Sequence, residues 1–397
     1  MKKVLMALVL AIWAVFLLTP KPALTAPEEI RIGLNATMSG AGAQWGIAFD
    51  RANRGRIEEI NKEGGLMVGG KRYTIKYFRY DNKADPPTSL ENAKTLINVD
   101  KVNFIFHHAS ANILPYLPIT SEKKITSMDL SVGSKTLGWP YNFNLLPAGT
   151  GRAEQAFKSF VKKFGIKKVA EINPDNESGQ VTKAEDGMAA KQQGVEILTS
   201  LFYTPGTTDF YPILTKSLIA KPEMLVLGVP SPRDVALIVK QARELGWSGP
   251  IGGAQCVAPP AVTFAQIAGK AAEGFMWSAP YSTDSNFWTK EEAAWATYWK
   301  EHWTDPFIAD SFGGCRQIGF LAEAIKKADS LDPDKIVRVL ETSNFVILGW
   351  KMRFGVTPDC YQGRPRSLVS PLCLKTIKDG KEMVTELILP TGVEKVH

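Results

Sequence analysis

The stretch Phe-Ile-Phe-His-His-Ala-Ser-Ala-Asn-Ile-Leu-Pro, residues 104–115, decides the fold. Residues 102–106 are mostly apolar and aromatic, which predicts a buried strand. A short turn follows, and Ser110 stands where the N-cap of a helix is expected. A strand that passes through a short turn into a helix is the repeating unit of a parallel sheet, so this stretch predicts an α/β fold.

The predicted helix start at Ser110 also suggests a binding site. The first turn of a helix carries N–H groups without intrahelical partners and a partial positive charge, which favours a carboxylate or a phosphate there. The Ser110 hydroxyl can donate to such an anion, the amide of Ala111 adjoins it, and His108 precedes the turn. An ordinary strand-to-helix turn with a capping serine explains the same residues, so the stretch alone leaves both interpretations open.

Outward from this stretch the chain alternates predicted strands and amphipathic helices. Strands are expected at residues 30–34 and 73–80 before it and at residues 125–130 after it. The same rhythm restarts near residues 142–147 and continues to residue 253. The pattern predicts two doubly wound α/β domains, and open sheets of this kind bind ligands at the carboxyl ends of their strands.

The last third of the chain continues with a strand at residues 275–278, a helix at residues 314–328 and a hairpin at residues 372–380. Between the first two, tryptophans recur every four residues and therefore share one helix face. These are Trp295, Trp299 and Trp303. We expect this face to belong to the core rather than to a ligand-binding wall.

The amino terminus predicts export. Lys2 and Lys3 precede an apolar run at residues 4–18, and Leu24-Thr25-Ala26 provides small residues for cleavage, so residues 1–26 are expected to be a signal peptide. The run is shorter than the ~20 residues that a membrane span needs. Removal of this segment lowers the formal charge from +7 to +4. No basic cluster with interleaved aromatic residues is evident, which argues against nucleic-acid binding.

The cysteines predict a disulfide rather than a metal site. The chain has four, Cys256, Cys315, Cys360 and Cys373, which allow three pairings in an oxidising compartment. A pair between Cys360 and Cys373 is favoured because a loop with proline and glycine lies between them, and a pair between Cys256 and Cys315 is the weaker alternative. No C-x-x-C spacing is present, so a structural zinc site is not expected.

Other motifs point to no cofactor. Gly40-Ala41-Gly42 with Gly46 lacks the spacing of a dinucleotide-binding loop. His107-His108 has no third metal ligand at helical spacing, so we expect no metal. Cys256 could act as a nucleophile, but half of a disulfide or a packing role explains it better. Asp81 and Asp85 are expected to be turn and helix-capping residues.

Several short motifs, in a fixed order, resemble those of one family. They include Ile32-Gly33, Met38-Ser39-Gly40, Gln44-Trp45-Gly46, Gly64-Gly65, Asp81-Asn82, Asp85-Pro86, Gln241-Ala242-Arg243, Ala271-Ala272-Glu273-Gly274 and Asp379-Gly380-Lys381. Together they resemble the periplasmic leucine/isoleucine/valine-binding family, the type I solute-binding proteins of ABC importers. The resemblance spans nearly the whole chain after residue 26. It implies two Rossmann-like lobes that close by hinge motion.

The family's architecture implies how the chain is divided. Lobe 1 would comprise residues 27–145 and 279–355, and lobe 2 would comprise residues 146–278 and 356–397. The lobes would be joined by three crossings, near residues 143–147, 277–281 and 354–366. A disulfide between Cys360 and Cys373 would then brace the third crossing. The resemblance further implies a monomeric, periplasmic, non-enzymatic receptor that delivers a small molecule to a membrane permease.

The family's ligand-binding positions match particular residues of this chain. In lobe 1 they are Trp45, Ser110, Ser131 and Gly133, and Gly133 replaces a threonine of the amino-acid binders. In lobe 2 they are Ser178, which replaces a tyrosine, and Gln255, which replaces the glutamate that neutralises the ligand ammonium group. Phe312 is a candidate second wall opposite Trp45.

The replacement at Gln255 bears on the ligand. A buried ammonium group without a carboxylate partner costs several kcal/mol. The sequence therefore favours an aliphatic or aromatic carboxylate without an α-amino group. Amino acids and amides stay open because Asp129 or Asp175 could supply the missing charge. A sensory domain of the same fold and an exported hydrolase are the alternative functions, and the second lacks an assembled nucleophile and base.

Overall fold

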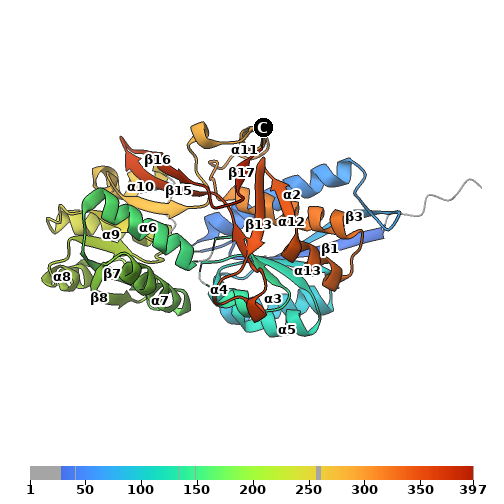
Figure 1. Cartoon of the computed structure of the whole chain (residues 1–397), viewed down its shortest axis with the longest axis horizontal. Coiled ribbons are helices and arrows are strands. Elements are labelled where there is room, and N and C mark those ends of the chain that lie inside the picture. The colour runs from blue at the N-terminus through green and yellow to red at the C-terminus, as the bar shows by residue number, and fades with distance from the viewer. Residues whose placement is uncertain (1–27, 41, 133, 148, 256–260, 397) are drawn as a thin grey trace, which may run out of the picture.

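Two β-sheets form the framework of the molecule (Figure 1). The computed structural model of the chain describes residues 28–396 except 41, 133, 148 and 256–260. In this part the first sheet has ten strands. In spatial order they are β12 (Asn344–Ile347), β13 (Trp350–Gly355), β14 (Ser367–Val369), β6 (Asn142–Asn144), β5 (Thr126–Leu130), β4 (Phe104–His108), β1 (Glu28–Ala36), β3 (Lys71–Asp81) and β2 (Leu66–Val68), with β17 (Glu394–Lys395) beside β13.

The second sheet has seven strands in the described part of the chain. In spatial order they are β16 (Lys381–Ile388), β15 (Leu372–Lys378), β11 (Met276–Ala279), β10 (Ile251–Gly253), β9 (Met224–Leu227), β7 (Lys168–Pro174) and β8 (Glu196–Tyr203). The strands from β11 to β8 are parallel, and β15 and β16 form the predicted late hairpin. Both sheets thus have a parallel centre, with antiparallel pairs at both edges of the first sheet and at one edge of the second.

Helices cover both sheets, and each sheet together with its helices is called a unit. The ten-stranded sheet belongs to the first unit and the seven-stranded sheet to the second. The helices of the first unit are α2 (Ala43–Lys62), α3 (Pro86–Asn98), α4 (Ser110–Ile113), α5 (Leu117–Glu122), α11 (Lys290–His302), α12 (Ser311–Ala328) and α13 (Pro333–Thr342). Those of the second unit are α6 (Gly149–Phe164), α7 (Glu177–Gln192), α8 (Tyr211–Ile219), α9 (Pro232–Glu244) and α10 (Ala261–Ala268). Single 3₁₀ turns occur at η1 (Leu114–Tyr116), η2 (Lys135–Gly138), η3 (Gly269–Ala272), η4 (Ser285–Phe287) and η5 (Tyr361–Gly363).

The centre of the first sheet is buried on both faces. In β1, Ile30, Ile32 and Leu34 are fully buried in a cluster that includes residues of α2 and α12. On the opposite face, a Cβ at Gly33 would come within 2.7 Å of the Leu96 side chain in α3. Near-continuous apolar strands between two helical layers are typical of parallel sheets, which confirms the predicted doubly wound fold.

Local sequence signals agree with the elements that form. The Asp85 side chain accepts a hydrogen bond from the Thr88 N–H at 2.8 Å and caps α3, with Pro86 in its first turn. Asp81 accepts from the N–H groups of Met38 and Lys83. These contacts confirm the predicted turn and capping roles of the two aspartates.

The tryptophan face of α11 belongs to the core, as predicted. Trp295 and Trp299 are buried, and Trp303 packs against both rings. Trp295 donates to the Ser311 hydroxyl at 3.1 Å, and Trp299 donates to the carbonyl of Asp305 at 3.0 Å. The indole N–H groups of these two tryptophans thus have partners within the fold. This face of α11 therefore packs against the rest of the first unit.

The chain passes repeatedly between the two sheets (Figure 1). Passages follow β6 at residues 145–147, β11 at residues 280–284, β14 at residues 370–371 and β16 at residues 389–393. The first two coincide with predicted crossings. Residues 354–366 are not a crossing, because β13 and β14 on either side of them both pair in the first sheet. The predicted division of the chain into lobes remains a proposal.

The predicted disulfide between Cys360 and Cys373 is not formed, and both are free, buried thiols. Cys360 follows β13 and packs against Leu137 on the side of the first sheet, whereas Cys373 lies in β15 of the second sheet. A disulfide requires two Cα atoms within ~7 Å, a condition that sequence spacing cannot establish. Cys315 is also a free, buried thiol, and Cys256 lies outside the described residues.

Candidate functional site

The candidate site is a cavity of about 270 Å³ between the two sheets. Its walls include the last residues of three parallel strands, namely His108 of β4, Leu130 of β5 and Tyr203 of β8. Strand carboxyl ends are where open α/β sheets bind ligands. The aromatic side chains of the lining are Trp45, Phe49, His108, Tyr203 and Tyr281. Such a lining suits a flat or branched apolar body.

The end of β4 reaches the cavity through a tight turn. Ala109 lines the cavity and has a φ of 70°, in the left-handed region that residues with side chains rarely adopt. α4 begins directly afterwards, so the predicted strand, turn and helix are all present. The side chain of Ser110 lies outside the described part of the chain, and its roles as cap and anion donor stay predictions.

The two adjacent histidines have different surroundings. His107 is fully buried with its Nδ1 2.6 Å from the Tyr116 hydroxyl, and burial lowers its pKa to about 3. His108 lines the cavity with its ring edge-on to Trp45 and Phe49, at centroid distances of 5.7 and 5.1 Å. Burial lowers the pKa of His108 to about 4, so its imidazole is neutral. Its Nδ1 has no hydrogen-bond partner among the described residues.

A buried cation lines the cavity. Arg152, in the first turns of α6, is only 1% exposed. Its Nη2 donates to the carbonyl oxygens of Ser278 at 2.9 Å and Gln255 at 3.2 Å, which are at the ends of β11 and β10. The Arg233 side chain also lines the cavity but is exposed to solvent. A positive charge held by backbone carbonyls at the cavity wall favours a negatively charged occupant.

Two carboxyl groups line the same cavity. Asp234 is buried and accepts a hydrogen bond from the Tyr203 hydroxyl at 2.9 Å. Asp310 precedes α12, and burial raises its pKa to about 6 against the opposing effect of the positive charges of Lys375 and Arg152. Asp310 is therefore mostly ionised at pH 7, because its pKa lies about one unit below that pH.

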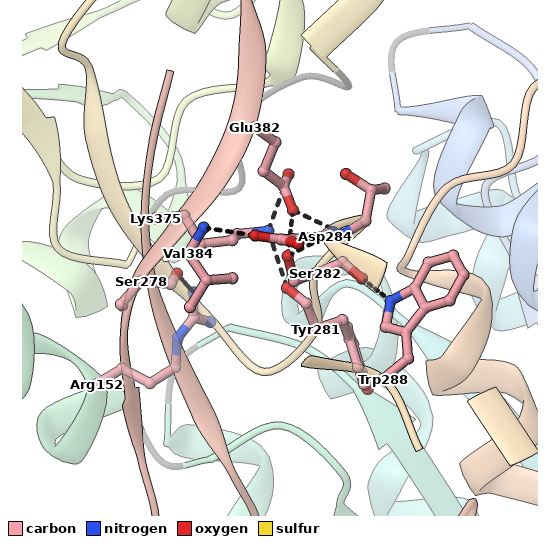
Figure 2. A network of polar contacts seen from close by, with 10 residues as sticks. Arg152, Ser278, Tyr281, Ser282, Asp284, Trp288, Lys375, Glu382 and Val384 are labelled. Carbon is pink, nitrogen blue, oxygen red and sulfur yellow. Dashed lines mark hydrogen bonds and ion pairs between the residues drawn. The ribbon is translucent and has the colours of Figure 1, made fainter. Parts of the chain in front are cut away.

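A network of polar contacts holds the passage that follows β11 (Figure 2). Pro280 and Tyr281 of this passage line the cavity, and this side of it is called the cavity floor. The Lys375 ammonium group lies 3.2 Å from the Glu382 carboxylate and donates to the Tyr281 carbonyl at 2.8 Å. Glu382 in turn accepts from the Ser282 hydroxyl and the Thr283 N–H, each at 2.7 Å. This ion pair ties the β15–β16 hairpin to the passage and fixes the position of Tyr281.

The structure brings three of the predicted site residues together. Trp45, His108 and Ser178 line the cavity, the first two from the first unit and Ser178 from α7 of the second. Ala111 lies in α4, one residue beyond the turn, and Gly133 lies outside the described residues. Contact of these residues with a ligand stays a prediction.

Two other predicted residues contact neighbours rather than the cavity. The Ser131 hydroxyl is buried and donates to the Asp129 carboxylate. Phe312 is buried behind Tyr281, with 6.4 Å between the ring centroids, and it also packs against Trp288. Phe312 therefore supports a residue of the cavity floor.

Gln255 is fully buried beside acidic residues of the second unit. Its Nε2 donates to Oδ1 of Asp186 at 3.0 Å, and its carbonyl oxygen accepts from Arg152. Burial and the nearby charge of Glu171 raise the pKa of Asp186 well above its ordinary value. The Gln255 side chain is not part of the cavity lining, whereas its backbone holds Arg152 at the wall.

Sequence reasoning missed Arg152, Tyr203, Tyr281 and Asp310. Tyr203 is the last residue of β8, and ligands of open α/β sheets bind at strand ends, so its position could have identified it. Tyr281 follows β11 by two residues and could have been found in the same way. Arg152 and Asp310 lie at helix starts, and only the arrangement of the two units places them at one cavity.

No group of three or more His, Cys, Asp or Glu side chains in the described part of the chain is arranged to hold a metal ion. None of the helices described combines the length and the apolar character that a membrane crossing requires.

Comparison with known proteins agrees with the fold. Residues 29–359 match the family model described as periplasmic binding protein. The leucine-, isoleucine-, valine-, threonine- and alanine-binding protein of Pseudomonas aeruginosa is 23% identical over 327 residues, which cover 81% of this chain and 84% of that protein.

Two solved structures share the architecture. A leucine-binding protein from Thermotoga maritima has a TM-score of 0.76 at 20% identity and covers 91% of this chain and 99% of its own. An ABC transporter solute-binding protein from R. palustris, in complex with benzoate, has a TM-score of 0.74 at 16% identity and covers 92% and 98%. Since the family model matches most of the residues, the chain belongs to the periplasmic binding protein family, in the group that contains the leucine-, isoleucine- and valine-binding proteins.

Proposed function

We propose that this chain is an exported solute receptor of an ABC importer that captures a small carboxylate in the cavity between its two units. The family supports the receptor role, because the Pseudomonas aeruginosa relative is an amino-acid-binding protein and the R. palustris one is a solute-binding protein of an ABC transporter that was solved with benzoate. The apolar run at residues 4–18, preceded by two lysines, supports export to the periplasm. Closure of the second unit over the ligand would present a distinct conformation to a membrane permease.

The cavity is the observation that carries this proposal. Its volume of about 270 Å³ is close to the lower end of ligand sites, which run from ~300 Å³ upward. A single aromatic ring or a short branched chain with a carboxylate is of that order of size. Trp45 and Phe49 from the first unit and Tyr203 from the second supply opposing aromatic surfaces for such a body.

The charge distribution supports an anionic ligand. Arg152 is a buried positive charge at the cavity wall, and Ala109 leads into the helix start where sequence analysis expected a carboxylate. Neutral His108 adds a ring nitrogen beside that end. A carboxylate placed between these groups would replace its hydration shell with fixed donors and a cation.

An acid without an α-amino group is the ligand class we favour. The family's ammonium-binding glutamate is matched by Gln255, whose side chain contacts Asp186 instead of lining the cavity. Binding of an aromatic acid is consistent with the aromatic lining, and the R. palustris relative was solved with benzoate.

A branched-chain amino acid is the second candidate, and Asp310 is the observation that favours it. Its carboxyl group lines the cavity and is ionised at pH 7, so it could pair with an ammonium group. Asp310→Asn separates the two candidates. The substitution should abolish binding of an amino acid but should leave benzoate binding intact or stronger, because a negative charge is removed.

The test is a thermal-shift panel of benzoate, aliphatic acids, L-leucine, L-valine and benzamide on the wild-type chain and on Asp310→Asn. A ligand that binds only the native state raises the melting temperature. We expect benzoate to raise it by several degrees and benzamide to leave it unchanged. If leucine stabilises best and Asp310→Asn removes the effect, the amino-acid candidate replaces the first. No turnover of the stabilising ligand is expected, and detectable product would support an enzyme instead.

A further inference from the structure

The cavity floor contains a buried tyrosine. Tyr281 follows β11, and its backbone carbonyl is held by buried Lys375. Its ring is packed beside Phe312 and under the Arg316 guanidinium, whose carbon lies 4.6 Å from the ring centroid. Tyr281 is only 5% exposed and lines the cavity.

The Tyr281 hydroxyl makes no hydrogen bond of standard geometry with another described residue, and the Arg316 guanidinium is the donor nearest to making one. The hydroxyl lies against Gly313, where an added Cβ would be 3.0 Å from the oxygen and 3.1 Å from Leu130. A buried polar group without a partner costs free energy, so such groups are rare in native folds unless a ligand or a water completes them. Tyr281 lines the cavity, so a bound ligand is a candidate for that missing partner.

Asp310 is a second polar group of the same floor. It lines the cavity and lies close enough for its charge to act on the Tyr281 hydroxyl. Burial raises the pKa of Tyr281 to about 12, so the phenol is a neutral group that can donate a hydrogen bond at pH 7. Ionised Asp310 can only accept one. The floor thus offers one donor and one strong acceptor.

We infer that Tyr281 and Asp310 form a subsite for a hydroxyl group on the ring of the bound acid, which makes the ligand class a hydroxy-substituted aromatic carboxylate. A ring hydroxyl accepts from Tyr281 and donates to Asp310 at the same time. An unsubstituted ring leaves both groups unpaired, and an ammonium group can only donate. The inference rests on the proposed function, because it places the second polar group of the same ligand.

The first sheet links the His108 end of the cavity to the surroundings of Tyr281. His108, at the expected carboxylate end, is the register partner of Leu130 in the neighbouring strand. Leu130 and the Tyr281 hydroxyl both lie against Gly313.

The test is calorimetric titration of the full chain with benzoate and 4-hydroxybenzoate. We expect 4-hydroxybenzoate to bind at least ~10-fold more tightly, because benzoate leaves the buried donor and acceptor unpaired. Tyr281→Phe should reduce this preference to about 1–2-fold by weakening 4-hydroxybenzoate while benzoate affinity is unchanged. Tyr203→Phe is the matched control, because it removes a cavity hydroxyl that already donates to Asp234 at 2.9 Å. It should change both affinities by the same factor.

Two results would overturn the inference and leave the proposed function in place. One is equal affinity of the wild-type chain for the two acids. The other is an equal loss of affinity for both acids in Tyr281→Phe. That result would show that the Tyr281 hydroxyl contacts the carboxylate, which the two acids share. If neither acid, nor any other carboxylate of the panel, binds the wild-type chain, the proposed function fails and the subsite fails with it.

Discussion

The Lys375 ammonium group lies 3.2 Å from the Glu382 carboxylate, and the two side chains are 6% and 8% exposed. Both belong to the β15–β16 hairpin, yet their remaining hydrogen bonds go to residues 281–283 (Figure 2). This buried pair therefore connects an edge of the second sheet to the passage that supports the cavity floor. Any loss of the pair should affect stability and ligand binding together.

Lys375→Met should destabilise the protein strongly. The substitution leaves the Glu382 carboxylate buried without its cation, and breaking a buried pair in this way costs ~3–5 kcal/mol. The double variant Lys375→Met/Glu382→Gln removes both charges and should be more stable than the single variant. Chemical denaturation measures the unfolding free energy of both variants. The control is Lys351→Met, which breaks an exposed pair with Glu394 and should barely change the midpoint. A single variant as stable as this control would show that the pair has no structural role.

Glu382 should also make stability depend on pH. Burial alone would raise its pKa, but the Lys375 charge and the hydrogen bonds from Ser282 and Thr283 outweigh it and hold the pKa below its ordinary value of 4.5. The folded state then resists protonation more than the unfolded chain does. The stabilisation of the folded state by the ionised Glu382 carboxylate is full above pH 4.5 and is lost as the pH falls through the lowered pKa. The difference in unfolding free energy between wild type and Glu382→Gln should therefore shrink below pH 4.5, and a constant difference would contradict this assignment.

Asp310 should make the hydroxyl preference depend on pH. Its pKa is raised to about 6 by burial, so between pH 7.5 and 5.5 the free protein changes from mostly ionised to mostly protonated at this site. A hydrogen bond to an ionised acceptor is stronger than one to a neutral group. The affinity ratio of 4-hydroxybenzoate to benzoate should therefore be larger at pH 7.5 than at pH 5.5. In Asp310→Asn the ratio should not change with pH, and a wild-type ratio that rises at low pH would be inconsistent with the subsite.

The free thiols lead to a simple chemical prediction. Cys315, Cys360 and Cys373 are free and buried, and burial raises the pKa of Cys315 and Cys373. They should be unreactive in the native protein and fully alkylated after denaturation without reductant. Mass spectrometry of the alkylated chain measures this. Reductant should leave the melting temperature unchanged, and a fall of several degrees would instead support a disulfide between Cys360 and Cys373.

Gln255→Glu tests the position that sequence analysis assigned to the ammonium-binding glutamate. The Gln255 side chain contacts buried Asp186, and Glu171 lies nearby, so a further carboxyl group should lower the unfolding free energy by ~2 kcal/mol or more at pH 7. Gln255→Met removes the hydrogen bond without adding a charge and should cost less. If Gln255→Glu stays stable and the ligand ranking moves toward leucine, this side chain faces the ligand after all.

The alternation of strands and helices was readable from sequence because each element carries its own signal. The turn after β4, the Asp85 cap of α3 and the late hairpin all depend on residues close together in the chain. The cavity depends instead on distant segments. Arg152, Tyr281 and Asp310 are more than 25 residues apart in sequence and meet only because the chain passes repeatedly between two sheets. The disulfide prediction failed for the same reason, since pairing is decided by the separation of two sheets rather than by loop length.

Isothermal titration of the wild-type chain and of Trp45→Ala with 4-hydroxybenzoate, benzoate and L-leucine tests most directly whether the cavity captures small carboxylates. We expect the wild-type chain to bind at least one of the three with one-to-one stoichiometry. Loss of the aromatic wall in Trp45→Ala should weaken that ligand by ~10-fold or more, whereas the control Trp295→Phe, in the core of α11, should keep its affinity. Absence of binding by all three ligands, or full affinity in Trp45→Ala, would show that this cavity is not a carboxylate site.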